Sequence, residues 1–150
     1  TKHVQFKNYV AKEPVIDNRI FLNGNRLFFL EPLESSSTQT YIEMARAVFD
    51  YYLQGRVSAV HVKEDITEYI KKLQNFVLWH YQFGSKYDTP FWEYAKTLTF
   101  KDETFDKFLG YSKISDCIPI TYGGTTQNKT YGQWPAYSFK NWNEGMTLNT

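Results

Sequence analysis

Two long stretches of the chain carry apolar residues at helical spacing, and this pattern constrains the fold more strongly than any other feature of the sequence. In the first stretch, apolar side chains recur three and four positions apart from Tyr41 to Tyr52, which places them on one face of a helix. The same spacing runs from Ile66 to Tyr81, within a second helix that we predict for residues 64–82. Since an amphipathic helix buries its apolar face against other elements, we predict a mainly helical globular fold.

Local signals predict where the helices begin and end. Small hydroxyl residues at positions 35–38 favour a helix start there, and Gly55 favours an end after the first helix. The acidic residue Glu64 stands at the expected start of the second helix, where the helix dipole favours negative charge. Pro90, preceded by Asp-Thr, predicts the start of a third helix, and a short fourth helix is expected over residues 103–109.

Short apolar runs ahead of the first helix predict strands. Residues 19–22 and 27–30 are two such runs, and the Asn-Gly-Asn cluster at 23–25 between them is a turn signal. After residue 112, glycines and prolines punctuate a loop-rich, aromatic stretch. We therefore predict a single unit over residues 1–150, mainly α with a short β lead-in.

The composition excludes several classes of function. The formal net charge is +1 and no basic run is present, so we expect neither a nucleic-acid partner nor a membrane partner. Cys117 is the single cysteine and the three histidines are far apart in sequence, which predicts no disulfide, no metal site and a reducing, cytoplasmic location. Aromatic residues make up 19% of the chain, either as an aromatic-rich core or, in part, as the lining of a pocket for a planar ligand.

The segment from Leu30 to Thr38 joins an apolar strand to the first predicted helix and has the features of an anion site. The first amides of a helix lack partners within the helix, and the macrodipole adds positive potential, so an anion could rest against the amides of Ser36 and Ser37. The carboxylate of Glu34, just ahead, could accept a proton or stabilise a cationic intermediate. Ordinary helix capping by Glu34 and the serines is the alternative, and spacing alone favours it.

Three segments resemble the flavin-dependent tryptophan halogenase family. Residues 29–37 read FLEPLESSS, which is similar to the family's FxEPLEST-type signature. Residues 75–81 (NFVLWHY) and 87–92 (YDTPFW) resemble its FxxxHY…DTPFW block, and residues 142–146 (WNEGM) resemble its late W-x-x-G-M element. The segments occur in the family's order over nearly the whole chain. The resemblance implies the C-terminal, substrate-side, helical part of an α/β FAD-dependent, monooxygenase-like halogenase fold, without the FAD-binding N-terminal half and its catalytic lysine.

The resemblance also implies a reaction and a role for individual residues of the signature. Such enzymes use reduced FAD, O2 and chloride or bromide to halogenate an aromatic, indole- or tryptophan-like substrate, and a flavin reductase supplies the FADH2. Glu34 matches the catalytic glutamate, and Ser35 matches the serine beside it. Ser36 and Ser37, followed by Thr38, replace a Thr-Gly pair whose amides hold the halide near the flavin. Gly would permit a backbone geometry that Ser37 disfavours.

Substrate contacts are expected from the late aromatic stretch. Trp142 resembles the family's stacking aromatic, and Phe139 and Tyr131 are further candidates. In tryptophan-specific members an acidic residue shortly before this aromatic holds the substrate ammonium, but Ser138 and Lys140 occupy that neighbourhood here. The resemblance therefore implies tryptophan or a different indole or phenol-like compound as the substrate.

Two other interpretations remain open. An aromatic-rich helical unit could be a non-enzymatic binding module, and a related flavin monooxygenase would hydroxylate its substrate without halide. The chain contains no GxGxxG nucleotide fingerprint, so this piece alone should neither bind FAD well nor turn over, whereas the parent protein would do both. A homodimer is one assembly compatible with this reading.

Overall fold

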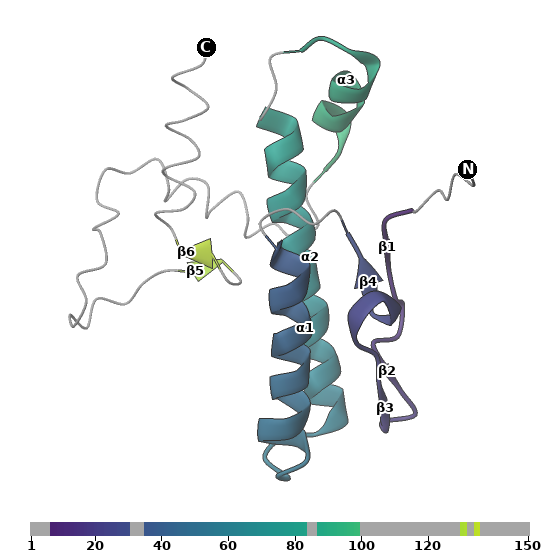
Figure 1. Cartoon of the computed structure of the whole chain (residues 1–150), viewed down its shortest axis with the longest axis vertical. Coiled ribbons are helices and arrows are strands. Elements are labelled where there is room, and N and C mark those ends of the chain that lie inside the picture. Colours follow the sequence, from purple (N-terminus) through teal and green to yellow (C-terminus); the bar gives the residue numbers. More distant parts are fainter. Residues whose placement is uncertain (1–6, 31–34, 84–86, 100–129, 132–133, 136–150) are drawn as a thin grey trace, which may run out of the picture. The chain divides into compact units, whose positions relative to one another are not determined.

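The computed structural model describes residues 7–30, 35–83, 87–99, 130–131 and 134–135, which are the coloured parts of Figure 1. The described residues are mainly helical with a small antiparallel β lead-in, as the sequence predicts. The chain divides into two compact units, residues 1–71 and residues 72–150, and the long helix α2 (Ala59–Phe83) contributes to both. The interpretation of the whole chain as one domain stays a prediction, and the helix predicted for residues 103–109 lies outside the described residues.

Four short strands form two antiparallel pairs ahead of the first helix. Strand β1 (Tyr9–Val10) pairs with β4 (Phe28–Phe29), and β2 (Val15–Ile16) pairs with β3 (Ile20–Phe21). The two predicted apolar runs are therefore strands β3 and β4, but each pairs with an earlier strand and not with the other. Strands β3 and β4 are separated by η1 (Gly24–Arg26), a short 3-10 helix. A hairpin between these two strands would need a tight turn at this place.

Polar residues with left-handed backbone angles make the turns of this lead-in. Asp17 and Asn18 have φ values of 51° and 54°, and the Arg19 amide donates to the Ile16 carbonyl at 3.0 Å, as in a type I′ turn. Asn and Asp tolerate this conformation better than other side chains do. These residues therefore allow β2 and β3 to pair over a very short connection.

The first helical segment consists of α1 (Ser36–Arg46) followed directly by η3 (Ala47–Tyr52), a π-helix. The predicted start at residues 35–38 is confirmed. The predicted end signal, Gly55, follows the segment with a φ of +69°, a left-handed conformation that glycine adopts without strain.

The apolar face predicted for this segment is correct at Met44 in α1 and wrong at Phe49 in η3. Met44 is buried, as predicted, whereas Phe49 is 65% exposed. A π-helix forms hydrogen bonds from residue i to i+5 and has more residues per turn than an α-helix. Phe49 therefore lies off the face that the α-helical period assigns to it, whereas Tyr52 stays half-buried with its ring on Phe21.

Helix α2 begins at Ala59, earlier than the predicted start at Glu64. The Ser58 hydroxyl accepts a hydrogen bond from the His61 amide at 3.1 Å, which is the geometry of an N-cap. The prediction that Glu64 lies at the start of this helix is therefore wrong. Ser58 was the sequence signal for the true start.

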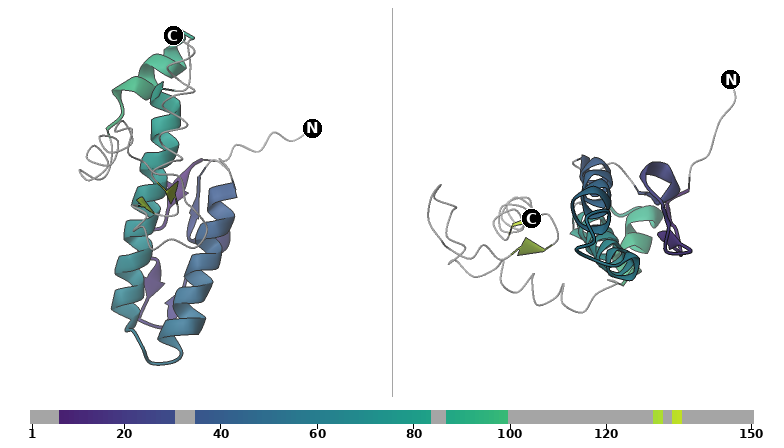
Figure 2. Two further views of the ribbon diagram at one scale, coloured as in Figure 1. Left: turned by 90° about the vertical axis from the view of Figure 1, so that its left-hand side faces the viewer. Right: turned by 90° about the horizontal axis from the view of Figure 1, so that it is seen from below.

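The core of the first unit lies among the strands, α1 and the first part of α2, which run side by side (Figure 2). Helix α2 contributes a row of buried apolar side chains at helical spacing. The sequence predicted this row from Ile66 onward. The buried apolar side chains of this unit are Val15, Leu27, Phe28, Leu30, Met44, Ala59, Val62, Ile66 and Ile70.

The second unit comprises the remainder of α2, helix α3 (Pro90–Thr97), and the antiparallel strands β5 (Thr130–Tyr131) and β6 (Trp134–Pro135). The predicted start of α3 is confirmed, because Thr89 is extended and Pro90 takes the first helical position. The Tyr81 ring of α2 contacts the rings of Phe91 and Trp92 of α3. Within the part of the chain that the structure describes, none of the helices has the length and apolar character needed to cross a bilayer.

Truncating a buried side chain of α2 should destabilise the protein strongly. Ile70 is 2% exposed, so Ile70→Ala should lower the free energy of unfolding by about 2–5 kcal/mol through lost burial and the cavity left behind. Urea denaturation of the purified protein measures this loss. The neighbouring exposed residue provides the control, because Lys71→Ala should change the stability by less than about 0.5 kcal/mol. Equal losses in the two variants would contradict the burial of this face.

Candidate functional site

The strand-to-helix junction that sequence analysis singled out has two described ends. Strand β4 ends at Phe29, and α1 begins at Ser36 with Ser35 as its N-cap residue. Glu34, the predicted catalytic residue, lies with residues 31–33 outside the described residues. The junction is therefore described through the residues that flank this segment.

The conformation of Ser35 distinguishes this helix start from an ordinary capped one. Its φ and ψ are 57° and 19°, in the left-handed region, and its side chain makes no capping hydrogen bond. An N-cap serine normally has an extended backbone and accepts a hydrogen bond from an amide of the first turn. Ser35 therefore does not cap the helix with its side chain, which was the alternative that spacing favoured.

Ser36, Ser37 and Thr38 form the first turn of α1, where the helix dipole is positive. Ser36 is fully buried, Ser37 is half-buried and Thr38 is exposed. Thr40, also fully buried, donates a hydrogen bond from its hydroxyl to the Ser36 carbonyl at 2.9 Å and fixes the first turn from below. The backbone amides of a helix start in this setting suit a small anion.

The replacement of the family's glycine by Ser37 is compatible with the backbone found here. Ser37 is helical, and the residue of the junction with positive φ is Ser35. The expectation that Ser37 needs a geometry available only to glycine is therefore not met, because the left-handed turn falls two residues earlier. A serine at position 37 introduces no backbone strain of that kind.

The predicted substrate residues belong to the second unit. The backbone of Tyr131 lies in β5, directly opposite Trp134 of β6, whereas Phe139 and Trp142 lie outside the described residues. The structure thus brings Ser35, Ser36, Ser37 and Thr38 together at one helix start.

Trp134 is a residue that the sequence reasoning missed. Its ring stacks on Phe76 of α2 with centroids 3.7 Å apart and ring planes at 12°, and Trp134 is only 5% exposed. The β5–β6 pair is therefore anchored on α2 by an aromatic stack. A large aromatic in a stretch rich in glycine and proline was the available signal for this contact.

His80 lies on the apolar face of α2 and has a structural role. It is buried, its ring meets Phe76 edge-on at 4.4 Å, and its Nδ1 lies 2.7 Å from the Phe76 carbonyl oxygen. Because a carbonyl only accepts hydrogen bonds, Nδ1 carries the proton in this contact. The imidazole is thereby fixed against its own helix.

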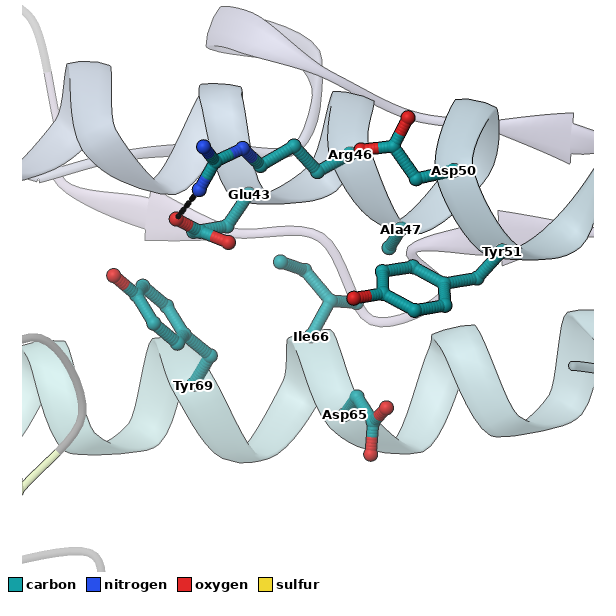
Figure 3. A pocket seen from close by; sticks show the side chains of 8 residues that line it. All are labelled: Glu43, Arg46, Ala47, Asp50, Tyr51, Asp65, Ile66 and Tyr69. Carbon is teal, nitrogen blue, oxygen red and sulfur yellow. Dashed lines mark hydrogen bonds and ion pairs between the residues drawn. The ribbon is translucent and has the colours of Figure 1, made fainter. Parts of the chain in front are cut away.

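A groove of about 610 Å³ opens between α1–η3 and α2 within the first unit (Figure 3). The π-helix η3 forms part of one wall. Tyr51 of η3 and Tyr69 of α2 extend into the groove from opposite walls. The groove is lined by Glu43, Arg46, Ala47, Asp50, Tyr51, Asp65, Ile66 and Tyr69. None of the residues predicted for catalysis, halide or substrate is among them.

The charges of this groove disfavour an anion. Its lining includes three carboxylates and a single guanidinium, and Arg46 is already paired with Glu43 at 3.3 Å. Burial, and secondly the charge of Glu43, raise the pKa of Tyr69 to about 12. A negative ion is therefore repelled here and attracted at the start of α1, so the two features differ in chemistry.

Among the residues that the structure describes, no three His, Cys, Asp or Glu side chains are arranged to hold a metal ion. The described part of the junction presents the backbone amides of the first turn of α1, which can bind a small anion.

Comparison with known proteins shows which family this chain is similar to. The family model described as tryptophan halogenase matches residues 3–145. The tryptophan 6-halogenase ThaL of Streptomyces albogriseolus is 31% identical over 147 residues, which cover 95% of this chain and 27% of that protein. The chain therefore spans about a quarter of the length of this relative. No solved structure matches the chain significantly.

The raised pKa of Tyr69 predicts a pH dependence of stability. The unfolded chain loses the phenolic proton near pH 10, whereas the folded chain holds it until about pH 12, so this contribution to stability is lost as the pH rises through that window. We expect Tyr69→Phe to remove a step near pH 12 from the tyrosinate absorbance titration and to flatten the fall in stability over the same range. Tyr51→Phe, on the facing wall, should leave that step in place. An unchanged titration of the Tyr69→Phe protein would contradict the assignment.

Proposed function

Because the chain belongs to the tryptophan halogenase family, we propose that the full-length protein is a flavin-dependent halogenase that chlorinates or brominates an aromatic, indole- or tryptophan-like substrate. The single observation that carries this proposal is the family match over residues 3–145, which includes the signature segment. Since the chain covers 27% of its curated relative, the activity is proposed for the whole protein and not for this piece alone.

The proposed role of the helix start is to hold the halide. The first turn of α1 offers amides at the positive end of the dipole, Ser35 makes no capping hydrogen bond, and Thr40 fixes the Ser36 carbonyl. Chloride and bromide are small spherical anions that need no particular direction of approach. Backbone amides at a helix start can therefore bind them. Ser36 and Ser37 are therefore the proposed halide residues, with Thr38 completing the turn.

The proposed role of Glu34 is to take up a proton. Electrophilic substitution forms a bond between a ring carbon and the halogen, and the hydrogen on that carbon must leave as a proton. A carboxylate just ahead of the halide residues can accept it, with Ser35 beside it. Trp142, Phe139 and Tyr131 are proposed to bind the aromatic ring of the substrate by stacking.

Reduced FAD with O2 would supply the oxidising equivalents, and a flavin reductase would supply the FADH2. No described residue has the glycine-rich turn of a dinucleotide site, and the sequence contains no such fingerprint, so we place the FAD site in the remainder of the full-length protein. What this chain contributes is an anion site, a proton acceptor and aromatic side chains. A cytoplasmic homodimer is the proposed state of the protein.

Halide-dependent product formation tests the proposal. We expect full-length protein, supplied with FAD, flavin reductase, NADH, O2 and bromide, to yield brominated products from a panel of indoles and phenols, detected by mass spectrometry. Glu34→Gln should lower kcat by about a hundredfold or more, because a positioned proton acceptor contributes at least that much. Glu31→Gln, in the same segment, is the matched control and should retain activity.

Three outcomes would contradict the proposal in different ways. Hydroxylated products formed without halide would assign the protein to the flavin monooxygenases. Tight aromatic binding with no product, in a protein that carries FAD, would indicate a non-enzymatic binding module. Full activity of the Glu34→Gln protein would leave halogenation in place and remove Glu34 from the mechanism.

A further inference from the structure

The groove between α1–η3 and α2 contains none of the residues proposed for halogenation, but its size suits a small ligand. Its volume of about 610 Å³ lies within the range of pockets that hold small molecules, roughly 300–1,000 Å³. One wall is a single face of α1–η3, on which the lining residues recur at 43, 46, 47, 50 and 51, and the other wall is α2 (Figure 3). Both walls belong to the first unit, so one compact unit forms the groove.

The middle of the groove is apolar and is bordered by two phenol rings. Ile66, which is 4% exposed, lies between Tyr51 and Tyr69, and these two side chains point toward one another from opposite walls (Figure 3). Ala47 lies opposite Ile66 and is too small to fill the space between the walls. The π-helix η3, a form that often occurs at functional sites, carries Tyr51. An apolar body of about the size of one ring can therefore pack between the tyrosines.

The lining of the groove carries unbalanced negative charge. Its single guanidinium, that of Arg46, is paired with Glu43 at 3.3 Å. No described residue forms an ion pair or a hydrogen bond with Asp50. Asp65 lies 3.4 Å from Nε2 of His61, which is positive only when it is protonated. Three carboxylates and one guanidinium leave the lining with a formal charge of −2.

These charges select the sign of the ligand. Burial, and secondly the charge of Glu43, raise the pKa of Tyr69 to about 12, so the negative potential of the carboxylate extends to this wall. A positive group in the groove would be attracted by Asp50 and Asp65 and would not need to break the ion pair of Arg46, whereas an anion would be repelled. Phenol oxygens can also accept hydrogen bonds from an ammonium group.

We propose that the groove between α1–η3 and α2 binds a primary amine carried on a small apolar body, of the arylalkylamine class. The apolar body lies on Ile66 between Tyr51 and Tyr69, and the ammonium group lies at the end of the groove where Asp50 and Asp65 flank Tyr51 (Figure 3). This site goes beyond the proposed halogenation and does not rest on it, because none of the proposed catalytic, halide or substrate residues lines the groove.

Isothermal titration calorimetry of the full-length protein tests the site with three probes that share a ring and a chain length but differ in charge. We expect 2-phenylethylamine to bind, with an affinity that falls as NaCl is raised, because salt screens the attraction of exposed charges. The neutral 2-phenylethanol should bind about five- to tenfold more weakly, since hydrogen bonds to charged groups are the stronger ones. The anion phenylacetate should bind more weakly still. Equal affinities for the three probes would overturn the assignment to a cation.

Substitutions locate the bound amine. Asp50→Asn and Asp65→Asn should each weaken the binding of 2-phenylethylamine about two- to fivefold, which is the usual effect of removing an exposed charged partner. Tyr51→Ala should weaken it about two- to tenfold, because the ring that packs on the ligand is lost. Glu64→Gln is the matched control, since it removes an exposed carboxylate next to Asp65 that does not line the groove, and it should leave the affinity unchanged.

The charge variants also separate lost binding from lost folding. Asp50 and Asp65 are exposed, so their substitution should leave Tm unchanged. Unchanged affinity in both of these variants, or an equal loss in Glu64→Gln, would overturn the site. A failure of the proposed halogenation would show in product formation and not in these titrations.

Discussion

Burial of one face of α2 is the constraint on which the rest of the structure depends. Its apolar row continues through both units, with Ile66 and Ile70 in the core of the first and Phe76 and Trp79 in that of the second. The strands of the lead-in are only two residues long and cannot be stable alone. Removing apolar surface from water along α2 therefore stabilises the elements that pack on it and, through them, the strand-to-helix junction.

Electrostatics divide the first unit into two chemically different places. The start of α1 combines the positive end of a helix dipole with Ser35, which has a left-handed backbone and makes no capping hydrogen bond. The groove farther along the same helical segment carries three carboxylates and a single guanidinium. The local charge therefore favours a small anion at the first place and disfavours one at the second.

Local patterns in the sequence predicted the elements whose causes are local. The hydroxyl-rich start of α1 and the Pro90 start of α3 both follow from short-range rules of capping. The same rules failed where a competing signal or a changed period intervened. Ser58 starts α2 ahead of the acidic residues, and the π-helix turns Phe49 outward.

The sequence by itself determined the family, through motifs in a fixed order, and the helical class, through a period that any α-helix must obey. Only the tertiary structure decided which strands pair, that Trp134 stacks on Phe76, and that the Tyr41 hydroxyl donates to the Phe28 carbonyl. Those contacts join residues far apart in sequence. Their partners are chosen by packing and by the geometry of hydrogen bonds in three dimensions, which no local pattern encodes.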